Sequence, residues 1–164
     1  MLPIHTILHP TDFSDCSDGA FRLACALARD YDARIVVLHV VELPAVVSGD
    51  GMLVIPYSID SEPLREQLQQ LQSGDPKIPV EHRLVEGYPA EQILRVAAEM
   101  SCDLILMGTH GRTALNRLLM GSVAEEVVRK APCPVLTVKT PRRPAPSSGK
   151  HVATEARESA PATT

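Results

Sequence analysis

The residues of this chain best suited to chemistry are three spaced glycines and the serine that follows the last of them. Two residues lie between Gly108 and Gly111, and nine further residues separate Gly111 from Gly121 and Ser122. Glycine lets the backbone approach a ligand closely and adopt positive φ angles. Where such a loop runs into a helix, the unpaired N–H groups and the positive end of the helix dipole attract anions. The spacing therefore predicts a site for a phosphorylated ligand.

Two commoner phosphate-binding motifs are absent from the sequence. A P-loop needs a glycine, four residues and then Gly-Lys followed by Ser or Thr, and no such run occurs. The nearest approach to a dinucleotide fingerprint begins at Gly49 and Gly51 but has Val54 in place of its third glycine. The predicted site is therefore of another type.

A strand and a helix have to position the glycine loop. The aliphatic run 104–107 precedes Gly108 and predicts a buried strand. A helical pattern begins at Ser122 and continues to about Lys130, before Pro132 stops it. The loop therefore joins the carboxyl end of a strand to the start of a helix.

The rest of the chain also alternates between strand and helix. Aliphatic or alternating runs predict strands at 4–9, 33–41, 79–85 and 134–138, the third of them at a sheet edge. Helical patterns are predicted from Ser14 or Asp15 to Tyr31, over 62–72, and from Pro89 to Met100. Right-handed β-α units of this kind form an open, doubly wound parallel sheet, a Rossmann-like α/β fold with helices on both faces.

The expected fold places the ligand at one edge of the sheet. In doubly wound sheets, ligands bind beyond the carboxyl ends of the strands, where the strand order reverses. Asp12 follows the first predicted strand, and Gly108 ends the fourth. The prediction of one shared crevice therefore requires the first and fourth strands to be neighbours.

Two segments interrupt the alternating pattern. Residues 43–59 mix prolines and glycines with aliphatic residues, and predict a long packed loop placed to cover a ligand or meet a partner subunit. Residues 140–164 are rich in Pro, Ser, Thr and Ala, and predict a disordered tail, because they offer little apolar surface to bury. We therefore expect one nucleotide-binding domain at 1–139 and a tail at 140–164.

Composition narrows the class of protein. Apolar residues make up 45% of the chain and aromatic residues only 3%, so the core must be aliphatic, as in a parallel α/β sheet. A net charge of −4 does not indicate a basic surface for binding nucleic acid or an anionic membrane. The sequence has no apolar stretch that could span a bilayer and no signal-type N-terminus. Four cysteines without a C-x-x-C pair are typical of reduced thiols, so we expect a cytoplasmic protein.

Several matches in order make residues 2–139 resemble the universal stress protein family. Besides the glycine set, they are the strand end at 10–14, the strand end at 38–41, Gly87-x-Pro89, and the run 131–136. The resemblance implies a five-stranded parallel sheet in the order 3-2-1-4-5, which places the first strand beside the fourth. Members of the family that bind ATP carry the full glycine signature, as this chain does.

The resemblance also implies an ATP site with contacts from both sides of the crevice. The implied contacts are Asp12 and the Val40 backbone at adenine, beside Pro10 and Thr11; the backbone of Met107 and Gly108 at the ribose; and Gly111, Gly121, Ser122 and Val123 at the phosphates, with His110 nearby. Arg112 is a further candidate contact for phosphate, and the alternative that His110 and Arg112 form a solvated face of the loop stays open. Glu125 and Glu126 would repel a triphosphate, which makes Mg²⁺ a candidate bridge.

Two positions depart from the family's pattern. Many nucleotide-binding members have Thr or Ser where this chain has Ala124, so one hydroxyl for the phosphates is missing. His9 stands where an aliphatic residue is usual, and we expect it to disturb the end of the first strand.

Simpler roles remain open for three of the residues singled out. Ser122 and Glu125 have the spacing of a capping box, so Ser122 can act as a helix cap. Asp12 can serve only as a cap in the turn that follows the first strand. His39 lies within a predicted strand, where a packed core histidine is the commoner role than a ligand.

The residues therefore support one leading functional hypothesis and two alternatives. The leading hypothesis is an ATP-binding stress-response protein whose nucleotide acts as a signal, because no residue specifies a catalytic base or an arginine finger. The alternatives are a slow adenine-nucleotide hydrolase and a nucleotide-free dimeric interaction protein. We expect a homodimer through Pro134–Lys139, because an aliphatic edge strand can pair with its copy, as is common in the family.

Overall fold

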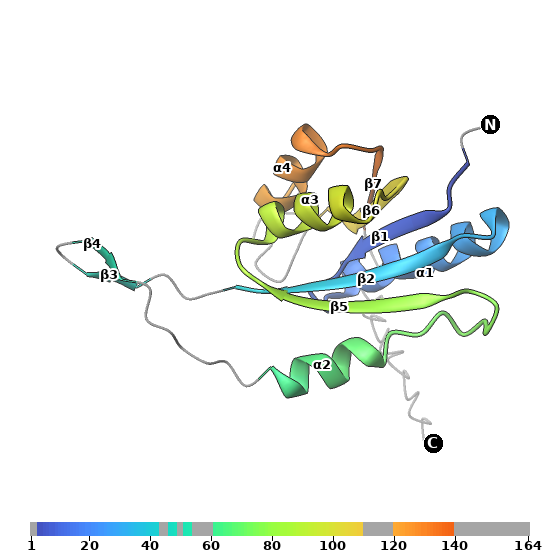
Figure 1. The fold of residues 1–164 in the computed structure, drawn as a ribbon, viewed down its shortest axis with the longest axis horizontal. Helices are drawn as coiled ribbons and strands as arrows, with labels where there is room; N and C mark the ends of the chain where they lie inside the picture. Colours follow the sequence, from blue (N-terminus) through green and yellow to red (C-terminus); the bar gives the residue numbers. More distant parts are fainter. Residues whose placement is uncertain (1–2, 43–45, 49–50, 54–60, 110–119, 140–164) are drawn as a thin grey trace, which may run out of the picture.

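The main element of the fold is a five-stranded parallel sheet in the order β5-β2-β1-β6-β7. The computed structural model describes residues 3–42, 46–48, 51–53, 61–109 and 120–139. The strands of the sheet are β1 (Thr6–Pro10), β2 (Arg34–Val41), β5 (Val80–Glu86), β6 (Leu104–Gly108) and β7 (Val135–Val138). β1 pairs with both β2 and β6 (Figure 1), so the predicted order and the required neighbours are confirmed.

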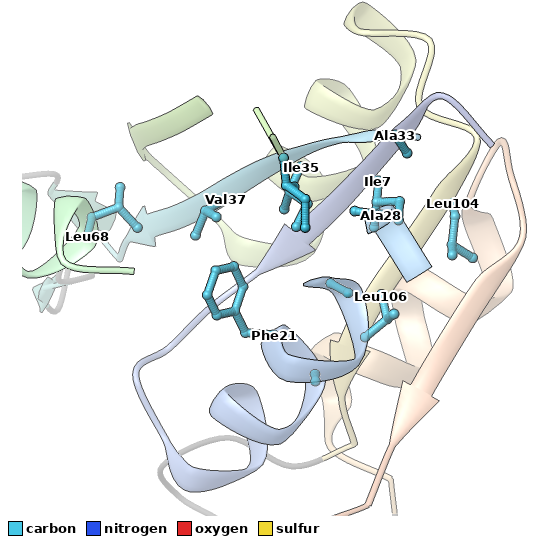
Figure 2. Packing of buried hydrophobic residues seen from close by; sticks show 12 residues of the cluster. Ile7, Phe21, Ala28, Ala33, Ile35, Val37, Leu68, Leu104 and Leu106 are labelled. Carbon is cyan, nitrogen blue, oxygen red and sulfur yellow. The ribbon is translucent and has the colours of Figure 1, made fainter. Parts of the chain in front are cut away.

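Helices cover both faces of this sheet. They are α1 (Asp15–Tyr31), α2 (Glu62–Gln69), α3 (Pro89–Glu99) and α4 (Ser122–Lys130). α1 and α2 pack on one face, where Figure 2 shows Phe21 and Leu68 beside Val37 of the sheet. α3 and α4 pack on the other face through residues such as Ile93 and Val127. No helix in the described ranges is long and apolar enough to cross a membrane.

The ends of α1 show why the chain turns where it does. Ser14 is the N-cap, and its side-chain oxygen accepts a hydrogen bond from the Ser17 N–H. Asp32 ends the helix in the left-handed conformation at φ 54°, and its N–H donates to the Ala28 carbonyl. Of the two starting residues predicted for this helix, Ser14 is therefore the cap and Asp15 is the first helical residue.

The segment at 43–59 differs from the predicted packed loop. β3 (Val46–Ser48) and β4 (Gly51–Leu53) form an antiparallel pair within it. Gly49 and Asp50 separate these strands in the sequence, and such residues are favoured in two-residue hairpin connections. That signal was present in the sequence and the loop prediction overlooked it. The predicted tail at 140–164 lies outside the described residues.

His9 does not disturb β1, so that prediction is wrong. The strand continues to Pro10, and the His9 ring is fully buried, 5.3 Å from the Phe21 ring. The Nδ1–H donates to the Leu106 carbonyl at 2.9 Å, which leaves Nε2 without a hydrogen-bond partner among the described residues. Burial lowers the pKa of His9 from 6.5 to about 4. The ring is therefore neutral near pH 7 and packs as a core side chain.

Candidate functional site

A hollow of about 500 Å³ opens at the carboxyl edge of the sheet, around the ends of β1, β2 and β6. Its volume is within the range of small-molecule sites. Nine of the predicted contact residues line it: Pro10, Thr11, Asp12, Val40, Met107, Gly108, Gly121, Ser122 and Val123. The other three, His110, Gly111 and Arg112, lie outside the described residues.

The turn after β1 presents Asp12 to this hollow. Its Oδ1 accepts the N–H and the hydroxyl of Ser14, at 3.2 and 2.7 Å. Its Oδ2 is buried and has no hydrogen-bond partner among the described residues. A buried acceptor left unpaired costs about 1–3 kcal/mol, and more when it is charged, so a ligand donor would complement it. One oxygen of Asp12 caps the turn, and the other is left for a different role.

Thr11 holds the same turn in place. Its N–H donates to the Leu38 carbonyl at 2.8 Å, and its Oγ1 accepts the Ser17 hydroxyl at 2.6 Å. The His39 Nδ1–H donates to the Thr11 carbonyl at 2.8 Å, so His39 is a packed histidine, as predicted, although it also lines the hollow. Thr11 Oγ1 also accepts the Phe13 N–H at 3.1 Å, and Phe13 has φ 62°, a conformation that is uncommon for an aromatic residue. The turn is therefore rigid.

The end of β2 turns backbone polar groups toward the hollow at Val40. The Leu38 carbonyl faces β1, where it accepts from Thr11, whereas the Val41 carbonyl faces the other way and accepts from the Gly87 N–H. Backbone groups two residues apart in a strand point the same way. Those of Val40 therefore point to the β1 side, where β1 has already ended at Pro10.

The two ends of the glycine loop meet beside β7. The Thr109 N–H donates to the Val138 carbonyl at 3.0 Å, and the Gly121 N–H donates to the Thr109 carbonyl at 2.8 Å. The Gly121 N–H is therefore already used within the protein. Gly121 can serve a ligand by allowing close approach of its backbone, but its amide is not a spare donor.

The start of α4 is open toward the hollow. Gly121 is the N-cap, Ser122 is the first helical residue, and no side-chain hydrogen bond caps the helix. The structure therefore contradicts the alternative, left open by the sequence, that Ser122 caps the helix in a capping box with Glu125. The first amides of a helix have no partner within it. Because Ser122, Val123 and Ala124 all line the hollow, it is a place where an anion can meet these amides.

The acidic residues of α4 lie outside the lining of the hollow. Glu126 binds Lys130 at 2.7 Å, and this contact lowers the pKa of the Glu126 carboxyl. Glu125 is exposed, and neither residue is among those that line the hollow.

The lining acid that sequence reasoning missed is Glu42. Its position directly after β2 was the available signal, because sites of this fold gather at the ends of strands.

Apolar side chains from three helices complete the walls. They are Leu64 from α2, Pro89 and Ile93 from α3, and Ala124 from α4, together with Leu38 from β2. Such walls suit the flat faces of an organic ring. Sequence reasoning did not select the first three, because their helices reach the crevice only through tertiary packing.

Gly108 is required by packing against α1. A Cβ at this position would lie 3.0 Å from the Cys16 sulfur and 3.2 Å from the Cys16 backbone carbonyl carbon. α1 therefore approaches β6 so closely that only glycine fits without a shift.

In the described part of the chain, no group of three or more His, Cys, Asp or Glu side chains is placed to hold a metal ion.

Comparison with known proteins agrees with this order of strands. The model of the universal stress protein family matches residues 3–139. This chain belongs to that family. It is 38% identical to universal stress protein MJ0531 of Methanocaldococcus jannaschii over 143 residues, which cover 84% of this chain and 83% of the relative.

Solved structures of universal stress proteins share the fold. The structure of MJ0577 from the same organism superposes with a TM-score of 0.69 at 28% identity, covering 85% of this chain and 98% of that one. A universal stress protein in complex with cAMP has a TM-score of 0.64 at 24% identity, covering 85% of this chain and 99% of the other.

Proposed function

We propose that this universal stress protein binds an adenine nucleotide in the hollow between β1 and β6, and that ATP is its ligand. The observation that carries the proposal is the buried Asp12 Oδ2, which lacks a partner among the described residues. It lines the same hollow as the uncapped start of α4. One acceptor for an amine and one cluster of anion-binding amides, in a single crevice, complement the two ends of a nucleotide.

Each part of the nucleotide has a matching feature. The exocyclic amine of adenine would donate to Asp12 Oδ2, and the Val40 backbone would pair with the ring edge. The apolar walls would cover the faces of the base. The amides at the start of α4 would bind phosphate, with Mg²⁺ offsetting the charge of a triphosphate. The cAMP complex of a related universal stress protein supports an adenine nucleotide as the class of ligand.

A signalling role fits the lining better than efficient catalysis. Enzymes that transfer phosphoryl groups use Lys or Arg with Mg²⁺ to stabilise the transferring phosphate. Among the described residues, those that line the hollow include no Lys and no Arg. Arg112, the predicted phosphate contact, lies outside the described residues. On the described lining, we favour a nucleotide-binding switch over a hydrolase. Phosphate release under saturating ATP would separate these two functions.

The decisive test is a binding measurement with matched variants. Protein purified without added nucleotide should release adenine nucleotide on denaturation. Asp12→Asn should weaken ATP binding by roughly tenfold to a hundredfold, because a hydrogen bond to a charged group contributes about 1.5–3 kcal/mol. Asp15→Asn, in the exposed first turn of α1, is the control and should bind normally. Equal affinity in Asp12→Asn and wild type would exclude Asp12 from the adenine site.

We further propose that the protein forms a homodimer through β7, which is an edge strand of the sheet. Leu136 in β7 is 39% exposed, and Val128 in the adjoining α4 is 47% exposed. An aliphatic edge with open backbone groups favours pairing with a second copy.

A further inference from the structure

A second hollow, of about 310 Å³, lies between α1 and the segment that joins α2 to β5. None of its lining residues lines the hollow at the carboxyl edge of the sheet. Its volume is at the lower end of the range of ligand sites, which suits a molecule much smaller than a nucleotide. Figure 2 shows the α1 face of the sheet, and Phe21, one of the residues that line this hollow, is labelled there on α1.

The floor of this second hollow is apolar. Phe21 and Ile78, which are 7% and 8% exposed, belong to the core cluster on the α1 face. Ala26 and the half-buried Cys25 continue the apolar wall along α1. A ligand there would bury an aliphatic or aromatic group against the core.

The rim carries opposite charges on opposite walls. Arg22 of α1 is exposed and forms no ion pair with any residue that the structure describes, whereas Arg29 is bound to Asp30 at 3.2 Å. Across the hollow, Asp75 lies in a turn that fixes its carboxylate. Its Oδ1 accepts the Lys77 N–H at 3.0 Å.

Further contacts make the Asp75 turn rigid. The Ser73 hydroxyl donates to the Asp75 carbonyl at 2.7 Å, and the Asp75 N–H donates back to the Ser73 oxygen at 3.3 Å. An anionic group that is already held in place beside an apolar floor can bind an ammonium group without the entropic cost of being ordered first.

We propose that this second hollow binds a free amino acid with an apolar side chain, in its zwitterionic form. The Arg22 guanidinium would bind the carboxylate, an arrangement that can use two parallel hydrogen bonds. The Asp75 carboxylate would bind the ammonium, and the side chain would lie on Phe21 and Ile78. A ligand with only a negative charge would be repelled by the Asp75 carboxylate, and a ligand with only a positive charge would be repelled by the Arg22 guanidinium. The zwitterion alone satisfies both walls.

The test compares leucine with two analogues that each lack one charge. By calorimetry, leucine should bind more tightly than N-acetylleucine or leucinamide by at least about tenfold. Arg22→Gln and Asp75→Asn should each weaken leucine binding by about the same factor. The asparagine at position 75 keeps a side-chain oxygen that can accept the Lys77 N–H. Leucine should also slow alkylation of Cys25 by iodoacetamide but not that of Cys133, the other half-buried cysteine.

Two further variants serve as controls. Glu91→Gln removes an exposed acid of α3, on the other face of the sheet and outside the lining, and should bind leucine like the wild type. Asp12→Asn should also bind leucine normally, so a failure at the nucleotide site would not affect this result. Absence of leucine binding at millimolar concentration, or equal binding of N-acetylleucine or leucinamide, would overturn the proposal.

Discussion

His9 is a titratable side chain enclosed between the sheet and α1, and this makes the stability of the protein depend on pH. The ring has 0% exposure, and one of its nitrogens already donates to the Leu106 carbonyl. A proton on Nε2 would place a charge in an apolar region that offers no acceptor among the described residues. Burial accordingly holds its pKa at about 4, although the nearby Asp12 charge favours the protonated form.

The sign of the pH effect follows from the two pKa values. Between the unfolded value of 6.5 and the folded value of about 4, the unfolded chain binds the extra proton and the folded protein does not. The free energy of unfolding should therefore fall as the pH drops through this window, by up to about 3 kcal/mol. Urea denaturation from pH 7 to pH 4 should show a shallower fall for His9→Leu than for the wild type. Parallel curves for the two proteins would contradict this account.

Gly121 gives a second prediction, which concerns binding rather than stability. Its φ of −64° and ψ of 150° are open to any residue, so the strain expected for a positive φ does not arise. Gly121→Val should therefore melt close to the wild type while losing ATP affinity, because the added side chain occupies the close approach to the phosphates. Calorimetric titration with ATP, beside a thermal melt, measures both parts. Unchanged ATP affinity would remove Gly121 from the site.

Two glycines near the start of α1 are expected to respond in opposite directions. Gly108→Ala forces a Cβ to 3.0 Å from the Cys16 sulfur, so it should destabilise by about 1–3 kcal/mol. Gly19 lies inside α1 with nothing within 4 Å of an added Cβ. Gly19→Ala should therefore stabilise by about 0.5–1 kcal/mol. Urea midpoints of the two variants test the pair, and a loss of stability in Gly19→Ala would contradict the packing described.

The elements with a strong period could be predicted from the sequence. α1 and the inner strands follow from regular apolar spacing, and their bounds agree within a few residues. The start of α4 at Ser122 was predicted as well, but its capping was not, because Gly121 is the N-cap and no side-chain hydrogen bond caps the helix. The apolar wall at Leu64 was equally hidden, since it depends on how α2 packs.

The order of the strands was implied by the family resemblance, and that order indicated the side of the site that contains Asp12. Asp12 could be selected because it closely follows a strand beside the reversal point. Its importance became visible only through burial, because the sequence does not reveal that one carboxylate oxygen lacks a partner. Likewise, the sequence could not show that Gly108 serves packing against Cys16.

At the scale of the whole molecule, the exposed edge at β7 gives a prediction about assembly. Light scattering at micromolar concentration should report a dimer. Leu136→Lys should give a monomer, because a lysine on an edge strand opposes pairing. Tyr88→Lys changes a side chain that is 59% exposed at the start of α3, and should leave the dimer intact. A monomeric wild type would refute the proposed interface.

The Val138 carbonyl ties together parts of the chain that are far apart in sequence. It accepts the Thr109 N–H at 3.0 Å and the Cys16 thiol at 3.3 Å. A protease cut or an engineered stop placed just before Val138 would thus remove an acceptor shared by the start of the glycine loop and the first turn of α1. Any minimal version of the protein has to retain Val138, although it is the last residue of the last strand.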